Sequence, residues 1–92
     1  MPPLSTEEAQ ARLGQLKDWR IEGGQLMKTF EFNHFRESLA FVNRIGAAAE
    51  EAGHHPDIDI RYNRVTLTLS THDAGGLTAK DFDLALKTEM LV

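Results

Sequence analysis

Two short segments with an apolar residue at every second position, residues 57–61 and 65–70, are separated by only three residues. Such alternation is typical of half-buried β-strands, and so short a link excludes the crossover that parallel strands require. An antiparallel hairpin is therefore predicted, with Asn63 as the turn residue best suited to a left-handed conformation. Two registers fit the apolar pattern: one sets Ile60 opposite Leu67, and the other is slipped by two residues.

A second pair of strand-like segments, residues 19–22 and 26–32, flanks Gly23-Gly24, whose glycines tolerate the positive φ of a tight turn. Segments with helical spacing precede, separate and follow the two hairpins. The predicted order is helix, two strands, helix, two strands, helix. This order most simply forms a single α+β domain over residues 1–92, with a four-stranded antiparallel sheet and three helices on one face.

Capping residues and apolar spacing mark the three helices. Ser5 and Glu8 form a predicted capping box at the start of a helix over residues 6–16. Asn33 is expected to cap the second helix, which ends at Gly53, and Thr78 is expected to cap the third. The predicted buried stripes are Phe35, Leu39, Val42 and Ile45 in the second helix, and Phe82, Leu86 and Met90 in the third.

The composition limits the classes of partner. A net charge of −4 without a Lys/Arg cluster argues against direct binding to nucleic acid. The absence of cysteine excludes disulfides and thiolate metal sites. Neither a signal peptide nor an apolar run of membrane-spanning length is visible, so we expect a cytoplasmic protein that does not bind membranes. The small core and the unpaired sheet edges predict a homodimer or homotetramer.

Three of the four histidines are predicted to gather at the open end of the second hairpin: His54, His55 and His72. Histidine exchanges protons near neutral pH because its unperturbed pKa is about 6.5. Glu50 and Glu51 place negative charge at the C-terminal end of a helix, where the helix dipole favours cations, and such a broken rule marks a functional site. Glu50 is expected to orient the ring of His54, and Asp81 lies within reach of the cluster.

Each of these residues also has another interpretation. The His54-His55 pair taken alone fits a polar loop after a helix end, and a capping box with Thr78 explains Asp81. The histidines with one carboxylate would also complete a zinc or iron site in a hydrolase. Adjacent histidines usually diverge in direction, however, and the chain lacks a His-Glu-x-x-His motif.

The spacing of these residues resembles that of the pterin-4a-carbinolamine dehydratases, and the resemblance covers nearly the whole chain. The residues that carry it are Glu50-x3-His54-His55-Pro56, Tyr62, Thr71-His72-Asp73, Gly76-Leu77-Thr78 and Asp81. The resemblance implies that His54, His55 and His72 are catalytic. It implies supporting or substrate-binding roles for Glu50, Asp57, Thr71, Asp81 and Lys80, the last standing where the family often has arginine.

The activity implied by the resemblance is dehydration of a 4a-hydroxytetrahydropterin to a quinonoid dihydropterin. This reaction recycles the cofactor of aromatic amino acid hydroxylases and uses neither a metal nor a cofactor besides the pterin substrate. Some family members also act as dimerisation cofactors of transcription factors. A non-enzymatic dimerisation or coactivator module with a protein partner is therefore the alternative, and a metal-dependent hydrolase is the more distant one.

Overall fold

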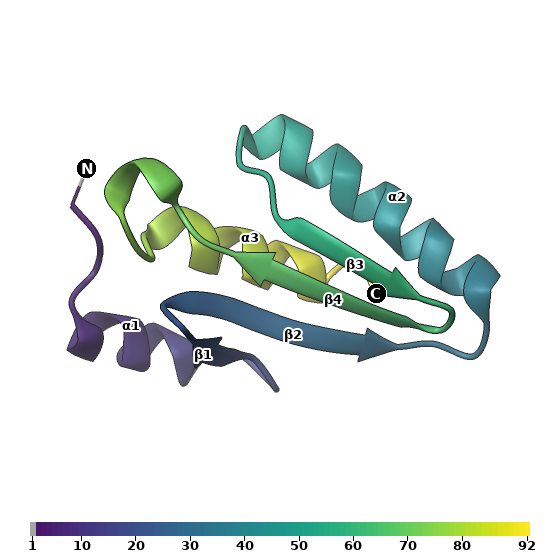
Figure 1. Ribbon diagram of the computed structural model, residues 1–92, viewed down its shortest axis with the longest axis horizontal. Coiled ribbons are helices and arrows are strands. Elements are labelled where there is room, and N and C mark those ends of the chain that lie inside the picture. Colours follow the sequence, from purple (N-terminus) through teal and green to yellow (C-terminus); the bar gives the residue numbers. More distant parts are fainter. Residues whose placement is uncertain (1) are drawn as a thin grey trace.

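The computed structural model describes residues 2–92 and shows three α-helices and four strands in the predicted order (Figure 1). The elements are α1 (Thr6–Leu13), β1 (Arg20–Glu22), β2 (Gln25–Glu31), α2 (Phe35–Ala52), β3 (Asp57–Arg61), β4 (Arg64–Leu69), the 3-10 helix η1 (His72–Ala74) and α3 (Ala79–Glu89). All neighbouring strands are antiparallel, and the sheet order is β1-β2-β4-β3. The predicted α+β fold is confirmed.

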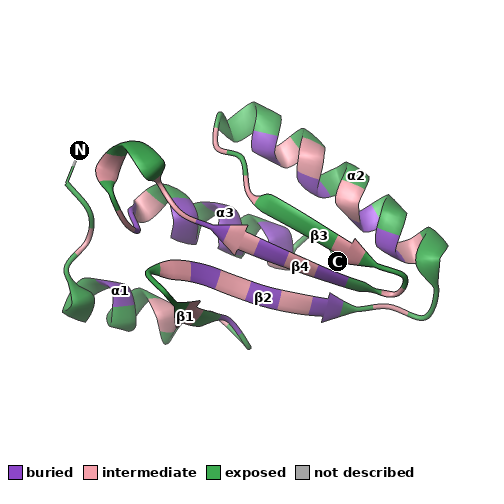
Figure 2. Cartoon of the chain, in the orientation of Figure 1, coloured by how far each residue is buried: buried purple, intermediate pink, exposed green. Residues whose placement is uncertain are grey.

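The helices cover one face of the sheet, and the core lies between the two layers. Buried and half-buried residues alternate along β2 and β4, as the purple and pink bands of Figure 2 show. The buried set of these strands, including Leu26 and Leu67, packs against Phe41 of α2 and Phe82 of α3. Figure 1 shows α2 alongside β3 and α3 behind the sheet. The helical layer is thus predicted correctly.

The second hairpin adopts the register that is slipped by two residues, in which Ile60 pairs with Val65. The alternation of apolar residues is compatible with both registers, because a shift of two residues keeps every side chain on the same face. Continued beyond the strand ends, the observed register sets His54 level with Thr71. The register therefore decides which side chains of the two chain segments can meet.

The predicted turn conformation is wrong, because Tyr62 and not Asn63 has the left-handed φ, at 51°. Asn63 instead joins the turn to the end of β2. Its side-chain amide donates to the carbonyl of Phe32 at 3.0 Å, and the Phe32 N–H donates to the Asn63 carbonyl at 2.8 Å. These two hydrogen bonds outweigh the local preference of asparagine for a left-handed conformation.

Two predicted helix boundaries require correction. The capping box of Ser5 and Glu8 is confirmed, and the hydrogen bond from the Ser5 backbone lowers the pKa of Glu8. However, α1 ends at Leu13 rather than at residue 16, because only turns follow its C-cap at Gly14. The N-cap of α2 is His34, one residue after the predicted Asn33, whose own N–H donates to Glu37 at 3.1 Å.

The buried stripe of α2 is rotated away from the predicted one. Ser38, Phe41, Ile45 and Ala49 face the sheet, whereas Phe35 and Leu39 are each 45% exposed. The ring of Phe41 lies 4.8 Å from the ring of Phe30, measured between centroids, and this contact fixes the rotation of the helix. Helical spacing alone allows either stripe, since both recur every three or four residues.

The buried stripe of α3 also differs from the predicted one. Phe82 is buried as predicted, but Leu86 and Met90 are exposed. Leu84 and Ala85 are buried instead. The reason is that α3 packs against α2 as well as against the sheet. Its buried surface is therefore wider than the stripe needed to contact the sheet alone, and it is rotated around the helix axis.

Candidate active site

The end of α2 fixes the position of His54. Gly53 adopts a left-handed conformation with φ of 63° and ends the helix, as predicted from the sequence. The N–H of His54 then donates back to the carbonyl of Ala49 at 3.1 Å, which holds the chain tightly against the last turn. The His54 side chain is directed toward the start of α3 and is only 11% exposed. A local turn therefore positions a largely buried imidazole.

Asp81 is fully buried and forms the centre of a hydrogen-bond network. One carboxylate oxygen bonds Nε2 of His54 at 2.6 Å. The other accepts from the Thr71 hydroxyl at 2.8 Å and from the Thr78 N–H at 2.9 Å. The two threonine hydroxyls also bond each other at 2.9 Å. Asp81 therefore caps α3, as its capping box with Thr78 predicts, and also orients His54.

This pairing selects the tautomer of His54. Because an ionised carboxylate only accepts hydrogen bonds, Nε2 of His54 donates to Asp81. In the neutral ring the other nitrogen, Nδ1, is then unprotonated and basic. A proton that arrives at Nδ1 produces an imidazolium whose charge Asp81 stabilises directly. The pair is thus arranged to accept a proton at Nδ1 of His54.

His55 belongs to a second, separate pair. Its Nε2 bonds a carboxylate oxygen of Glu50, and both side chains are exposed. Glu50 therefore orients His55, and the prediction that it orients His54 is wrong. The left-handed turn at Gly53 directs His54 toward α3. His55 precedes Pro56, which favours an extended backbone, and its side chain points back to Glu50 in the last turn of α2.

His72 lies on the loop that also carries Thr71. It is exposed and begins η1, which ends at Gly75 in a left-handed conformation with φ of 75°. Thr71 and Gly76 exchange backbone hydrogen bonds of 3.1 and 3.4 Å and so close the loop at its base. His72 is therefore part of a closed loop, and the residue before it, Thr71, contacts Asp81.

The side chains of the remaining predicted site residues, Asp57 and Lys80, lie outside this network. Asp57 is exposed at the start of β3, and strand alternation places it with Asp59 on the open face of the sheet, away from Asp81. Lys80 lies in the first turn of α3 and lines the cavity beside His54. The structure thus joins His54, Thr71 and Asp81, and it places Asp57 outside their network.

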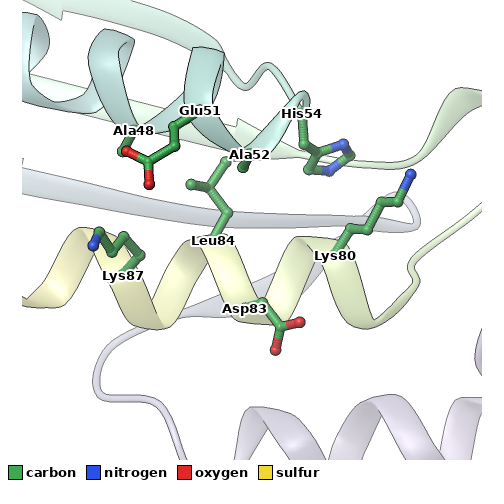
Figure 3. A pocket seen from close by; sticks show the side chains of 8 residues that line it. All are labelled: Ala48, Glu51, Ala52, His54, Lys80, Asp83, Leu84 and Lys87. Atoms are coloured by element: carbon green, nitrogen blue, oxygen red, sulfur yellow. The ribbon is translucent and has the colours of Figure 1, made fainter.

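A cavity of about 330 Å³ lies between α2 and α3, with His54 on its wall (Figure 3). Its size is at the lower end of the range for small-molecule sites, ~300–1,000 Å³. An apolar floor and a charged rim line it together with His54: Ala48, Ala52 and Leu84 form the floor, and Glu51, Lys80 and Lys87 form the rim. Asp83 also borders the cavity, but its carboxylate points away from α2 (Figure 3). This combination suits a flat heterocycle with polar edges.

Sequence reasoning missed most of this cavity. Lys80, Leu84 and Lys87 stand at positions i, i+4 and i+7 of α3, so their common face was visible in the sequence. The sequence did not show that α2 packs beside that face, so that the two helices together enclose the cavity. The role of the Thr78 hydroxyl in the network was missed for a similar reason, because its partner Thr71 lies on another element.

Residues 2–92 contain no group of three or more histidine, aspartate or glutamate side chains positioned to hold a metal ion. No helix in this part of the chain has both the length and the apolar character needed to cross a membrane.

Comparison with known sequences gives consistent matches over the full domain. The family model for pterin 4 alpha carbinolamine dehydratase matches residues 2–91. A relative from Roseiflexus castenholzii is 52% identical over 89 residues, covering 97% of this chain and 96% of the relative. One from Acidobacterium capsulatum is 50% identical over 92 residues and covers both chains completely. Both carry a provisional pterin-4-alpha-carbinolamine dehydratase name.

Two solved structures have a similar fold. The crystal structure of a transcriptional coactivator/pterin dehydratase from Brucella melitensis matches with a TM-score of 0.93 at 30% identity, covering 97% of each chain. A pterin dehydratase-like protein identified as a RuBisCO assembly factor in the alpha-carboxysome matches with a TM-score of 0.70 at 28% identity, over 82% of this chain and 89% of that one.

Proposed function

The chain belongs to the pterin 4 alpha carbinolamine dehydratase family, and from this premise we propose that it dehydrates a 4a-hydroxytetrahydropterin to the quinonoid dihydropterin. Such a reaction would recycle the pterin of aromatic amino acid hydroxylases. The observation that carries the proposal is the pair of His54 and Asp81, a largely buried imidazole held by a carboxylate on the wall of a cavity. That pair supplies the base that the reaction needs.

The reaction breaks the bond between C4a and its hydroxyl oxygen and forms a double bond between C4a and N5. The N5 lone pair supplies the electrons, a base takes the N5 proton, and the hydroxyl leaves as water after it receives a proton. We assign the base to Nδ1 of His54, because Asp81 occupies Nε2 and stabilises the resulting imidazolium. His72, next to Thr71 and exposed to solvent, is assigned as the acid. Positioned groups of this kind contribute roughly 10²–10⁴-fold each.

Assays of the purified protein test this proposal against its alternatives. We expect dehydration of 4a-hydroxytetrahydropterin at a rate that a chelator leaves unchanged. Activity that a chelator abolishes and zinc or iron restores would instead indicate a metal-dependent enzyme. A folded protein without dehydratase activity would indicate an interaction module.

Replacing His55 with alanine is expected to act on substrate binding. His55 is exposed and paired with Glu50 outside the Asp81 network, so we assign it to holding the pterin ring. One lost hydrogen bond corresponds to roughly a tenfold rise in KM, and kcat should stay within about threefold of wild type. Steady-state kinetics measure both constants. Glu50→Gln, which keeps His55 but weakens its orientation, should produce a smaller change in KM. A loss of kcat as large as that of His54→Ala would contradict the assignment.

An exposed apolar surface favours a second property, self-association. We propose that the chain forms a homodimer or homotetramer through Phe35 and Leu39 of α2 and Tyr62 of the hairpin turn. All three side chains are exposed, and the rings of Phe35 and Tyr62 stack at 6.5 Å between centroids. The adjacent strand β3 is an edge of the sheet, with unpaired backbone groups on its outer side. A protein partner would use the same kind of surface.

Sedimentation at tens of micromolar tests this association. Wild type should sediment as a dimer or tetramer, and Leu39→Glu should shift the population toward monomer because it buries a charge in the interface. Leu86→Glu changes a leucine of α3 that lies outside this surface and is even more exposed than Leu39, so it serves as the control and should leave the oligomer intact. A monomeric wild-type protein would contradict the proposal.

A further inference from the structure

Glu51 has a position that neither helix capping nor the histidine network explains. It is an exposed carboxylate in the last turn of α2, where the helix dipole disfavours negative charge. Its neighbour Glu50 has a partner in His55. Within residues 2–92, none of the ion pairs includes Glu51. Glu51 nevertheless lines the same cavity as His54, so its carboxylate is available to a ligand there.

The lining residues follow one another in a definite order along the cavity. Figure 3 shows His54 and Lys80 at one end, Leu84 in the middle, and Glu51 with Lys87 at the other end. The floor in the middle is apolar, so it accepts the face of a flat ring. Hydrogen-bonding groups are therefore available mainly at the ends of the cavity and along its rim.

The pyrimidine edge of a pterin carries its polar groups in a matching order. Beyond the reacting carbon C4a come the carbonyl oxygen O4, which accepts, and then N3–H and the 2-amino group, which both donate. Two parallel N–H donors fit the two oxygens of one carboxylate, as in an arginine–carboxylate pair. An ammonium group is a donor suited to O4. With C4a at His54, the ring places O4 toward Lys80 and the two donors toward Glu51.

We propose that Glu51 recognises the 2-amino and N3–H donors of the pterin, with Lys80 donating to O4. This assignment makes Glu51 the residue that distinguishes pterins from pteridines with an oxygen at C2. It rests on the proposed function, because that function is what places C4a at His54.

Fluorescence titration with pterin and with its 2-oxo analogue, 2,4-dioxopteridine, tests this assignment without turnover. Wild type should bind pterin more tightly, because the analogue turns an oxygen toward the Glu51 carboxylate. Glu51→Gln presents one acceptor and one donor, which match the N3–H and the oxygen of the analogue. The ratio of the two affinities should therefore fall by roughly 10- to 100-fold, the range of one charge-assisted hydrogen bond.

Asp83→Asn is the matched control. It removes the same charge from the same cavity, but the Asp83 side chain points away from α2 in Figure 3. Its ratio of affinities should equal that of wild type. An unchanged ratio in Glu51→Gln, or an equal change in both variants, would overturn the role of Glu51 even if the wild-type protein dehydrates its substrate. A wild-type protein that neither binds pterin nor dehydrates would overturn the proposed function and this inference together.

Discussion

Replacing His54 with alanine should lower kcat by roughly 10²–10⁴-fold, the usual contribution of a positioned acid/base group. His54 is the only one of the proposed catalytic histidines held by the buried carboxylate of Asp81. Its removal takes away the base for the N5 proton, and Asp81 then lacks a partner on one oxygen. His72→Ala should fall in the same range because it removes the proposed acid. Steady-state kinetics with freshly generated 4a-hydroxytetrahydropterin measure both variants.

His34→Ala provides the matched control for these two substitutions. His34 is an exposed histidine at the other end of α2, where it lies 3.7 Å from Glu37. Its replacement makes the same chemical change without touching the network and should leave kcat unchanged. Retention of more than about a third of wild-type kcat in His54→Ala would contradict its role as base, since the acid/base range begins near 10²-fold.

Replacing Asp81 with alanine should have the largest effect on stability. The buried carboxylate accepts from Thr71 and from the Thr78 N–H; without it the N–H would have no partner, and the Thr71 hydroxyl would keep only its contact with the Thr78 hydroxyl. Lost capping and unsatisfied buried donors together cost roughly 2–4 kcal/mol in the free energy of unfolding. For a domain of this size the melting temperature should fall by about 10–25 °C. Thermal and urea unfolding measure this change, and kcat should fall together with stability.

Asp81→Asn separates the structural role of Asp81 from the catalytic one. The amide keeps the volume of the carboxylate and can still accept from the Thr78 N–H, so the stability loss should be only about half as large. In that orientation its NH₂ group faces Nε2 of His54 and imposes the opposite tautomer, in which Nδ1 is protonated. The kcat of Asp81→Asn should therefore fall by roughly 10²–10⁴-fold despite a folded protein. A variant with near wild-type kcat would show that Asp81 only caps α3.

Interactions over short stretches of chain were predictable from the sequence. The two capping boxes, at Ser5 and at Thr78, and the helix stop at Gly53 each depend on residues within about four positions of one another. The alternating strands and their short links likewise determined the antiparallel hairpins and hence the α+β fold. The spacing of the histidines and of Asp81 carried the family resemblance. All these signals are local or are repeated along the chain.

Partners between distant segments were decided only by the tertiary structure. Glu50 is four residues from His54 and five from its actual partner His55, so sequence separation did not identify the partner, and the direction of the chain after Gly53 decided between them. The contact of Thr71 with Asp81 depends on the docking of α3 against the end of β4 and on the hairpin register, which the apolar pattern left open.

Lys28 shows the same limit within the core. It lies on the buried face of β2, where the alternation would lead one to expect an apolar residue. Its ammonium donates to Glu89 at 2.7 Å and to the Lys17 carbonyl at 3.0 Å, partners 61 and 11 residues away in the sequence. A charge is tolerated there because those partners replace its hydration. Local patterns predict the type and order of the elements, but the surface that a helix buries and the identity of distant polar partners depend on how the packed elements are turned toward one another.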